Sequence, residues 1–369
     1  MLKVSKHIQD LKAYKPGMSL ESIKNKHNLS KFYKLSSNEN LAGCSNEVKK
    51  VLVKAIESAH FYPDPQCTKL KQNFSDFYKI KTDYLSFGNG SNEIIDILIR
   101  TYCNPIEGEK VLTSQGAFIA YKVCAQAARL EVKQCPLNKN LGFDIDAIKK
   151  AINEDAKIKI VFIANPNNPT GTYVSKDELL SLVLFCKDKN ILLIIDEAYN
   201  EFVTATDFPK TLDWVKTYNH VAVIRTLSKA YALAGLRLGV LIANPEIISY
   251  FDKVRNPFNV NSLVQAGASA AIKNTDYLKQ IYENNKQGLS FFYKSFDSLK
   301  IDYTKSQANF ILFDCKQDAQ DFCKQLLTKA LVLRPLLPYG FKTQVRMTVG
   351  PMEQNQKAVK ILQDYFNKA

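Results

Sequence analysis

Short apolar segments alternate with amphipathic segments along most of the chain. The apolar segments predict β-strands, because each is brief and is bounded by polar or turn residues. They are Val111–Thr113, Ile158–Ala164, Ile191–Ile195, Val221–Ile224 and Leu238–Ala243. Strands that are apolar throughout are typical of a parallel sheet covered by helices on both faces. The alternation of such strands with helical patterns therefore predicts an α/β fold with a mostly parallel sheet.

The pattern changes after about residue 256. Residues 261–300 predict two helices, of which the second is long and rich in lysine and aromatic residues. Short predicted strands and helices follow, at Asn309–Phe313, near Gln317–Lys329, at Val345–Val349 and from Glu353 to the end. This mixture predicts a smaller α+β unit.

The length of the chain also predicts more than one domain. A single hydrophobic core stops growing at roughly 250–300 residues, and this chain has 369. We expect an N-terminal arm over residues 1–40 that associates with the small domain, a large α/β domain over 41–256 and a small α+β domain over 257–369.

Composition excludes several classes of protein. Hydrophobic residues make up 46% of the chain and charged residues 23%, as in ordinary globular proteins, which excludes a disordered chain or a coiled-coil rod. No apolar run approaches the ~20 residues that a membrane span needs. The first 14 residues contain scattered lysines and no apolar core of a signal peptide. We therefore expect a cytoplasmic protein without a membrane partner.

The formal net charge of +14 raises the question of a nucleic-acid partner. The lysines, however, are scattered among acidic and apolar residues, and no basic run, zinc-finger spacing or aromatic RNA signature accompanies them. We interpret them as a solvated surface and expect no nucleic-acid partner. Arginine is rare, with 7 residues among the 50 basic ones, so an arginine here indicates a need for a planar, two-pronged donor.

The cysteines and histidines do not form a metal-binding pattern. The 8 cysteines include no Cys-x-x-Cys pair, and the 4 histidines have no ligand spacing. We expect free thiols in a reducing compartment and no metal.

The most informative stretch is residues 225–239, Arg-Thr-Leu-Ser-Lys-Ala-Tyr-Ala-Leu-Ala-Gly-Leu-Arg-Leu-Gly. The preceding strand delivers Thr226, Ser228 and Lys229 onto a loop, where open α/β sheets bind ligands. A phosphorylated aldehyde cofactor would need these groups. The lysine amine would form the Schiff base, while the hydroxyls and the Arg237 guanidinium would hold the phosphate.

A carboxylate, Asp196, stands at the end of the apolar strand Ile191–Ile195. Its burial there is costly unless a cation accompanies it. A pyridinium nitrogen would supply that cation, and the carboxylate would keep the ring protonated. A simple cap at the strand end is the alternative.

Two turn sequences supply further candidate groups. Residues 165–171, Asn-Pro-Asn-Asn-Pro-Thr-Gly, are rich in turn formers and could hold the Asn168 amide against a ring hydroxyl. Residues 87–91, Phe-Gly-Asn-Gly-Ser, open an apolar helix whose first N–H groups could cradle a phosphate. The third glycine of a dinucleotide fingerprint is absent.

Together these segments resemble the fold-type I pyridoxal-phosphate-dependent aminotransferases over nearly the whole chain. The motifs in residues 165–171 and 225–239, together with Asp-Glu-Ala-Tyr-x-Glu-Phe from Asp196, mark that superfamily. Motifs elsewhere narrow the resemblance to the histidinol-phosphate aminotransferase branch and its close relatives; they are 14–17, 37–40, 255–261, 334–335, 339–341 and 345–350. The resemblance implies a seven-stranded, mostly parallel sheet flanked by helices, a smaller α+β domain and pyridoxal 5′-phosphate as cofactor.

The resemblance also implies a role for each matching residue around the cofactor. Lys229 would be the Schiff-base lysine and Asp196 the partner of the pyridinium nitrogen. Asn168 and Tyr199 would contact the phenolic oxygen of the ring, and Phe118 would stack on the ring where the family usually has tyrosine. The phosphate would be held by Ser91, Asn92, Thr226, Ser228 and Arg237.

Further residues would bind the substrate or reach a second subunit. By the same resemblance, Arg334 and Arg346 would bind the distal anion of the substrate, and Tyr14 and Asn38 would also contact the substrate. Tyr62 matches the tyrosine that reaches the cofactor phosphate of the neighbouring subunit, which implies a homodimer.

The resemblance implies transamination, in which histidinol phosphate and 2-oxoglutarate are interconverted with imidazole acetol phosphate and glutamate. An aromatic amino-acid transaminase shares most of the motifs and is an alternative, as is a decarboxylase of a phosphorylated amino acid. A basic nucleic-acid-binding protein on a catalytically idle scaffold is an alternative of another class. The sequence departs from the family pattern at Met18, Leu41, Asn92 and Phe118, and the first two lie near the arm expected to close over the substrate.

Overall fold

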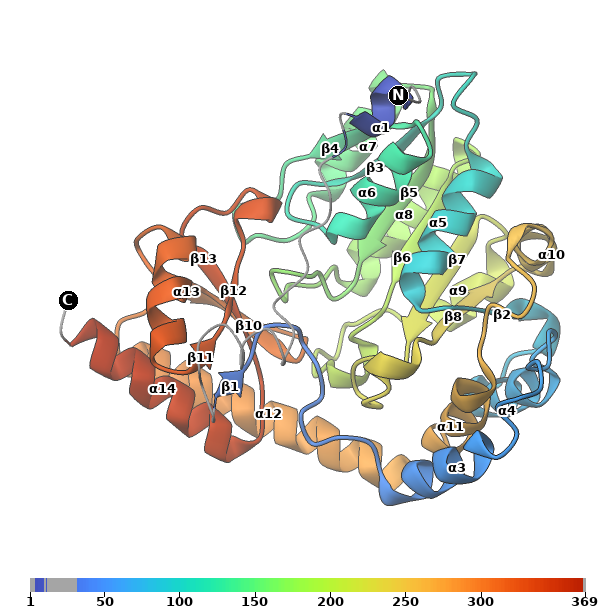
Figure 1. Ribbon diagram of the computed structural model, residues 1–369. Coiled ribbons are helices and arrows are strands. Elements are labelled where there is room, and N and C mark those ends of the chain that lie inside the picture. The colour runs from blue at the N-terminus through green and yellow to red at the C-terminus, as the bar shows by residue number, and fades with distance from the viewer. Residues whose placement is uncertain (1–3, 10, 12–31, 368–369) are drawn as a thin grey trace.

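A seven-stranded sheet forms the centre of the larger lobe in the computed structural model, which describes residues 4–9, 11 and 32–367 (Figure 1). The strand order is β2-β8-β7-β6-β5-β3-β4. Within it, β8 runs in the direction opposite to the other six strands. The strands are β2 (Leu85–Gly88), β3 (Lys110–Ser114), β4 (Glu131–Cys135), β5 (Ile158–Ala164), β6 (Leu192–Asp196), β7 (Val221–Thr226) and β8 (Gly239–Ala243). The predicted α/β fold with a mostly parallel sheet is confirmed.

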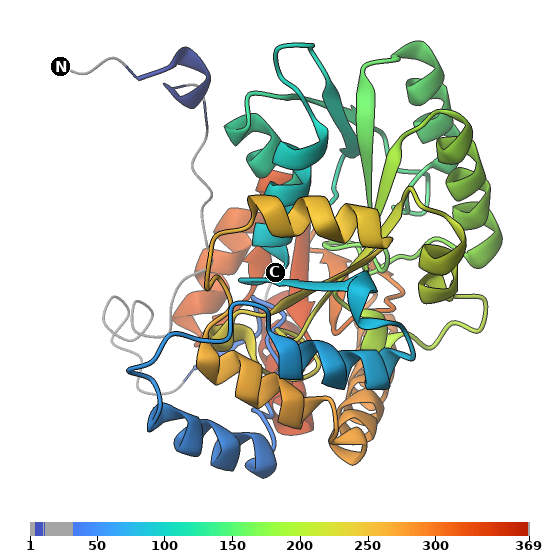
Figure 2. The same ribbon diagram turned by 90° about the vertical axis from the view of Figure 1, so that its right-hand side faces the viewer.

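Helices cover both faces of this sheet, as the apolar strands require (Figure 2). On one face lie α5 (Ser91–Tyr102), α6 (Ile119–Ala127) and α10 (Pro245–Val254). On the other lie α7 (Ile145–Glu154), α8 (Lys176–Asp188) and α9 (Thr211–Thr217). A capping box begins α8, in which the Glu178 carboxylate accepts the Ser175 backbone N–H at 3.0 Å.

The smaller lobe contains an antiparallel sheet of order β12-β13-β10-β9 and is α+β, as predicted. Its strands are β9 (Tyr303–Thr304), β10 (Phe310–Asp314), β12 (Arg334–Pro335) and β13 (Gln344–Thr348). The helices α12 (Thr275–Ser298), α13 (Ala319–Thr328) and α14 (Met352–Phe366) accompany it. Most of its apolar side chains form a core cluster separate from that of the larger lobe.

Two segments of the described chain pass from one lobe to the other. The strand β1 (Tyr33–Lys34) pairs in parallel with β11 (Leu331–Val332), so the chain just before residue 40 lies against the smaller lobe. The long helix α12 runs from the smaller lobe to a group of packed helices beside the larger one, α3 (Asn46–Ile56), α4 (Thr68–Tyr78) and α11 (Ser262–Ala271) (Figure 1). Buried residues of α11 belong to the core of the larger lobe. The domain boundaries at residues 40 and 256 stay predictions.

Short elements complete the part of the chain that the structure describes. They are α1 (Lys6–Gln9) and the 3₁₀ turns η1 (Thr82–Tyr84), η2 (Asn200–Phe202), η3 (Ala234–Leu236) and η4 (Leu337–Tyr339). None of the helices in residues 4–9 and 32–367 has the length and apolar character needed to cross a membrane. Among the same residues, no group of three or more His, Cys, Asp or Glu is placed to hold a metal ion.

Candidate active site

A cavity of about 280 Å³ lies where the carboxyl ends of β5, β6 and β7 face the smaller lobe. Parallel strands present their carboxyl ends at one edge of a sheet, and open α/β sheets bind ligands there. Most of the predicted site residues line this cavity: Asn38, Ser91, Asn92, Phe118, Asn168, Asp196, Tyr199, Thr226, Ser228, Lys229, Arg237, Arg334 and Arg346. The fold therefore brings together residues that are up to 308 positions apart in the sequence.

Two predicted residues are not among those that line the cavity. Tyr14 lies outside the described residues. Tyr62 lies on the segment between α3 and α4, where its side chain is 83% exposed and its ring stacks on Phe258 with 4.7 Å between the ring centroids. Tyr62 therefore points to the surface of its own chain.

Asp196, the last residue of β6, is buried at the floor of the cavity. Its Oδ2 accepts a hydrogen bond from the Tyr121 hydroxyl at 2.8 Å, and its Oδ1 accepts the Ala198 backbone N–H at 3.1 Å. Burial raises the pKa of Asp196 to about 6, because these two neutral donors offset only part of the cost of a buried charge. The site thus holds a carboxylate that a cationic partner would stabilise.

A buried ion pair fixes the strand ends behind Asp196. Glu197 Oε2 accepts hydrogen bonds from Arg225 Nε at 2.9 Å and from Arg225 Nη2 at 2.7 Å. The other oxygen of Glu197 accepts a bond from the Thr211 hydroxyl at 2.6 Å. Because Glu197 follows Asp196 and Arg225 precedes Thr226, this pair sets the spacing between two neighbouring functional side chains.

Lys229 lies on the loop after β7, and its amine donates to the Ser37 carbonyl at 3.3 Å. The pKa of Lys229 is lowered to about 8, first by burial and then by the positive charges of Arg346 and Arg237, while Glu39 and Asp196 act in the opposite direction. About a tenth of this amine is therefore uncharged at pH 7, far more than of an ordinary lysine amine. An uncharged amine can act as a nucleophile or a base.

The beginning of α5 and the loop after β7 form a small polar cradle. The Thr226 hydroxyl lies 3.0 Å from the Ser228 hydroxyl, and Ser91 opens α5 beside them. Arg237 has φ +63°, and its guanidinium lies against Gly90, where any Cβ would collide with it. Hydroxyls, a guanidinium and the first N–H groups of a helix are the donors that phosphate prefers.

The smaller lobe contributes two arginines from adjacent strands. Arg334 on β12 lies opposite Arg346 on β13 in the sheet register, and both line the cavity. The Arg346 guanidinium donates to Asn168 Oδ1 and, at 2.9 Å, to the Ser36 carbonyl. The cavity is consequently cationic on the side of the smaller lobe.

Tyr199 is buried, and burial raises its pKa to about 12, so its hydroxyl keeps its proton at neutral pH. That hydroxyl accepts a hydrogen bond from the Asn38 side-chain amide at 3.0 Å. The hydroxyl hydrogen of Tyr199 is thereby left to donate elsewhere in the cavity. Asn38, predicted to contact the substrate, bonds here to Tyr199.

Comparison with known proteins identifies the family. Residues 30–362 match the family described as "Aminotransferase class I and II". The chain belongs to this family. The aminotransferase is 39% identical over 370 residues to the histidinol-phosphate aminotransferase of Bdellovibrio bacteriovorus, with 100% of this chain and 99% of the relative covered. It is 37% identical over 361 residues to the histidinol-phosphate aminotransferase of Bacillus subtilis, with 98% and 99% covered.

A solved structure has the same fold. The histidinol-phosphate aminotransferase from Sinorhizobium meliloti, in complex with pyridoxal-5′-phosphate, matches this aminotransferase with a TM-score of 0.90 at 22% identity. The match covers 100% of this chain and 98% of that one. The predicted fold class of the aminotransferase is confirmed.

The cavity of this aminotransferase fits pyridoxal phosphate. Asp196 provides a buried carboxylate whose hydrogen-bond partners are neutral, which suits a pyridinium N–H. Gly239 lies so close to the start of α5 that a Cβ there would come within 2.6 Å of Gly90 C and 2.7 Å of Ser91 N. This close approach keeps the first turn of α5 beside the hydroxyls of Thr226 and Ser228, where the cofactor phosphate would be held.

Sequence reasoning missed three groups in the site of this aminotransferase. Tyr121 bonds to Asp196, the Ser37 carbonyl accepts from Lys229, and Tyr339 lines the cavity. Tyr121 stands three residues after Phe118, a spacing at which residues at the start of a helix lie near one another. That spacing was a usable signal, whereas a backbone carbonyl such as that of Ser37 leaves no trace in the sequence.

Proposed function

We propose that this pyridoxal-phosphate-dependent aminotransferase transfers the amino group of histidinol phosphate to 2-oxoglutarate in histidine biosynthesis, as a cytoplasmic homodimer. The observation that carries the proposal is the convergence of Lys229 and Asp196 from the larger lobe with Arg334 and Arg346 from the smaller lobe on one cavity. The first pair supports cofactor chemistry, and the second supports a substrate that carries an anion. The two full-length relatives described above, 39% and 37% identical, support the choice of substrate.

Pyridoxal phosphate supplies an aldehyde that accepts amines and a protonated ring that withdraws electrons from the reacting carbon. We assign Asp196 to the ring nitrogen, where its carboxylate would keep the proton on that nitrogen. Ser91, Thr226, Ser228 and Arg237 would bind the phosphate through hydroxyl, guanidinium and helix N-terminal donors.

We assign Asn168 and Tyr199 to the phenolic oxygen of the ring. Asn168 Oδ1 accepts from Arg346, which leaves the Asn168 amide hydrogens to donate. Tyr199 accepts from Asn38 and likewise has its own hydrogen to donate. Phe118 lines the same cavity and would pack on the ring, and Asn92 follows Ser91 at the phosphate end.

Lys229 would carry the proton that passes between the substrate carbon and the cofactor carbon. Its amine, with a pKa lowered to about 8 by burial and by Arg346 and Arg237, can take a proton from the substrate carbon and return it to the carbon of the cofactor. The Ser37 carbonyl, 3.3 Å from Nζ, would orient the amine.

Arg334 and Arg346 would hold the distal anion of each substrate in turn. A guanidinium fork can bind either a carboxylate or a phosphate, which suits a site that processes a phosphorylated amine and a dicarboxylic oxo-acid. The bonds from Arg346 to Asn168 and to Ser36 would fix one arginine relative to the cofactor site. We also assign Tyr14 to the substrate.

A homodimer would complete the phosphate site. Apolar side chains are exposed on α3 and the segment that follows it; they are Val53 (69%), Ile56 (58%), Phe61 (67%) and Tyr62 (83%). Exposed apolar groups gathered on one segment favour a protein partner. In the dimer the Tyr62 side chain would extend into the partner subunit and donate a hydrogen bond to the cofactor phosphate there.

A substrate panel tests the proposal. Purified enzyme is assayed with histidinol phosphate, phenylalanine and tyrosine as amino donors and 2-oxoglutarate as acceptor, and kcat/KM is compared. The proposal requires the highest value for histidinol phosphate. A higher value for the aromatic amino acids would favour the aromatic transaminase, and release of carbon dioxide would favour the decarboxylase.

The Lys229→Ala variant tests the cofactor assignment separately. It is expected to lose transamination and the absorbance of the lysine-bound cofactor, because Lys229 is the one lysine among the described residues that line the cavity. After borohydride treatment, mass spectrometry should find the cofactor on Lys229 of the wild-type protein. A yellow, active Lys229→Ala variant would overturn the assignment.

A further inference from the structure

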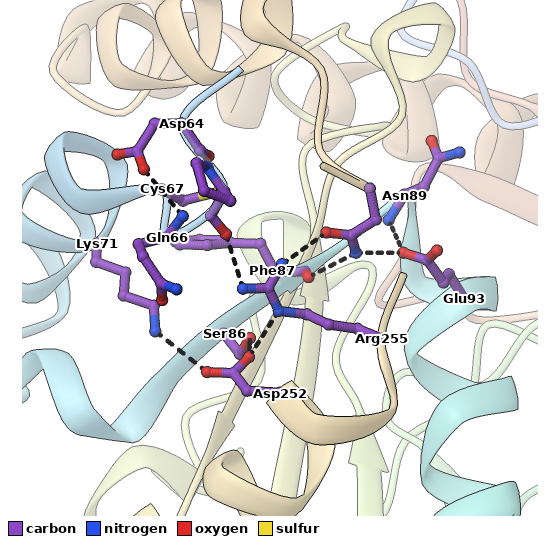
Figure 3. A network of polar contacts seen from close by, with 12 residues as sticks. Asp64, Gln66, Cys67, Lys71, Ser86, Phe87, Asn89, Glu93, Asp252 and Arg255 are labelled. Carbon is purple, nitrogen blue, oxygen red and sulfur yellow. Dashed lines mark hydrogen bonds and ion pairs between the residues drawn. The ribbon is translucent and has the colours of Figure 1, made fainter. Parts of the chain in front are cut away.

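Arg255 bonds to two segments of the chain. One carries Tyr62, and the other contacts the turn proposed to bind the cofactor phosphate. Arg255 follows the end of α10, and its side chain is only 9% exposed. The guanidinium donates in three directions, from Nε to Asp252 Oδ1 at 2.9 Å, from Nη1 to Asn259 Oδ1 at 3.0 Å and from Nη2 to the Pro65 carbonyl at 2.7 Å (Figure 3). The bond with Asp252 offsets the charge, so the other two bonds are left to fix backbone segments.

The bond from Arg255 to the Pro65 carbonyl reaches the segment that carries Tyr62. The Pro65 carbonyl lies three residues after Tyr62, in the connection between α3 and α4. The same connection is held by Gln265, which donates to the Asp64 carbonyl at 2.9 Å. The ring of Tyr62 stacks on Phe258, three residues after Arg255. The position of Tyr62 therefore depends on Arg255 and on the chain directly after it.

The bond from Arg255 to Asn259 reaches the turn proposed to hold the phosphate of the subunit's own cofactor. The Asn259 amide donates to the Phe87 carbonyl at 3.2 Å and to Glu93 Oε2 at 2.7 Å (Figure 3). That same Glu93 oxygen accepts the backbone N–H of Asn89 at 2.6 Å. These contacts bracket the turn between β2 and α5, directly before Ser91.

We propose that Arg255 is a positioning residue for both cofactor sites of the dimer. Through Asn259 it fixes the phosphate-binding turn of its own subunit, and through Pro65 it fixes the Tyr62 that enters the site of the partner. This inference rests on the homodimer proposed above. It adds to that proposal a physical connection between the two sites. The Arg255 guanidinium sets the distance between the phosphate-binding turn of one subunit and the Tyr62 that the same subunit contributes to its partner.

The geometry requires arginine. A lysine at this position could keep an ion pair with Asp252, but a single ammonium at the end of a flexible stem cannot reproduce three donors in a fixed plane. The Arg255→Lys variant therefore preserves charge and removes the link. Arg100→Lys is the matched control, because Arg100 also donates from Nε to an aspartate, Asp96, at 2.9 Å, and it lies on the exposed side of α5.

A mixed dimer separates the two effects. One subunit carries Lys229→Ala together with Arg255→Lys, and the other has neither substitution; different affinity tags allow the mixed dimer to be isolated. Borohydride then fixes cofactor only on the subunit that retains Lys229, whose own phosphate turn is unaltered and whose Tyr62 comes from the altered partner. The loss of fixable cofactor is followed by mass spectrometry after transfer into a solution that scavenges pyridoxal phosphate.

We expect cofactor loss to be about tenfold faster than in the mixed dimer with Lys229→Ala alone, a ratio that corresponds to about 1.4 kcal/mol. Arg100→Lys in place of Arg255→Lys should leave the rate unchanged. When Tyr62→Phe is added to the Arg255→Lys subunit, the two effects should not add, because Arg255 acts through Tyr62. An unchanged rate with Arg255→Lys, or full additivity with Tyr62→Phe, would overturn the inference.

Asn259→Ala provides a second variant that leaves the Pro65 contact in place. Put on the subunit that retains Lys229, it should speed cofactor loss there; put on the partner, it should not. Equal effects from both placements would overturn the proposal that Arg255 acts on its own subunit through Asn259 and on the partner through Pro65. Sedimentation of each preparation distinguishes the failures: a monomeric chain would overturn the dimer and with it the inference, whereas an intact dimer with an unchanged rate would overturn the role of Arg255 alone.

Discussion

The hydroxyl of Tyr121 donates a hydrogen bond of 2.8 Å to Asp196 Oδ2 at the floor of the cavity. Tyr121 is fully buried on α6, and its ring stacks on Phe162 of β5 with 4.6 Å between the centroids. The hydroxyl is thus held by packing, and it lowers the pKa of Asp196 against the larger, opposite effect of burial. Tyr121 favours the charged form of the carboxylate before the cofactor binds.

Tyr121→Phe is expected to weaken binding of pyridoxal phosphate at pH 6 but not at pH 8. Loss of the hydrogen bond raises the Asp196 pKa above its present value of about 6, so at pH 6 more of the carboxyl is protonated and unable to pair with a pyridinium. A rise of about one unit gives roughly a fivefold higher dissociation constant at pH 6. Titration of the cofactor-free protein at both pH values measures this.

Tyr303→Phe is the control for that experiment. The Tyr303 hydroxyl also donates to an aspartate, Asp297, at 3.0 Å, but this pair lies on the surface of the smaller lobe. The control should bind cofactor as the wild type does. An equal loss of affinity at pH 6 and pH 8 in Tyr121→Phe would instead indicate that the Tyr121 hydroxyl acts in some way other than through the pKa of Asp196.

Part of the site was predictable because some of its residues fall in short segments at the ends of strands. Thr226 ends β7 and is followed closely by Ser228 and Lys229, and Asp196 ends β6, so a parallel sheet places these residues at the same edge. The strand order and the single antiparallel strand β8 were not predictable, because apolar runs reveal burial and not direction.

Contacts that depend on packing between distant segments were also hidden. The bond between Arg255 and Pro65 joins residues 190 positions apart, and that between Arg346 and Ser36 joins residues 310 positions apart. The sequence marked these arginines as unusual through their rarity, but only the fold determines which carbonyl each one meets. Arg255 was part of a recognised motif, and the reason for its presence became visible in three dimensions.

Arg346 is expected to control the pH at which Lys229 becomes reactive. Only the uncharged amine captures the cofactor, and the Lys229 pKa is lowered to about 8, so the capture rate of cofactor-free protein should rise about tenfold for each pH unit below 8 and level off above it. Arg346→Gln removes a positive charge that lowers this pKa, so the rise should move to higher pH. Rapid-mixing absorbance measurements with pyridoxal phosphate give the profile.

Arg346→Lys is the matched control, since it keeps the charge and loses the fork. Its capture profile should stay near that of the wild type, while its KM for both substrates should rise because a lysine cannot bond to Asn168 and Ser36 together. Coincident pH profiles for Arg346→Gln and the wild type would refute the electrostatic role of Arg346.

Ile56→Asp is expected to weaken the proposed dimer. Ile56 ends α3, is 58% exposed and lies near the exposed Phe61 and Tyr62, so a charge there would have to be buried on association. Sedimentation should show a dissociation constant at least about tenfold higher. Ile106→Asp, at a site that is 94% exposed between α5 and β3, should have no effect. If both variants sediment as the wild type does, α3 is not at the interface.

Gly239→Ala is expected to impair phosphate binding more than any other part of cofactor binding. Gly239 pairs with Thr226 of β7 and with Gly88 of β2, and a Cβ there would lie 2.6 Å from Gly90 C and 2.7 Å from Ser91 N. Because both obstacles are backbone atoms, the start of α5 has to move away from Thr226. The dissociation constant for pyridoxal phosphate should therefore rise about tenfold or more.

Two comparisons make this prediction specific. Pyridoxal, which lacks the phosphate, should lose much less affinity for the Gly239→Ala variant than pyridoxal phosphate does, because Asp196 and Lys229 do not touch the displaced turn. Gly235→Ala lies in the same motif, but its Cβ would meet no atom within 4 Å and its φ is not positive, so that variant should bind both compounds normally. Equal losses for the two compounds would mean that the substitution disturbs the sheet as a whole, and that the close approach of Gly239 to α5 does not serve the phosphate.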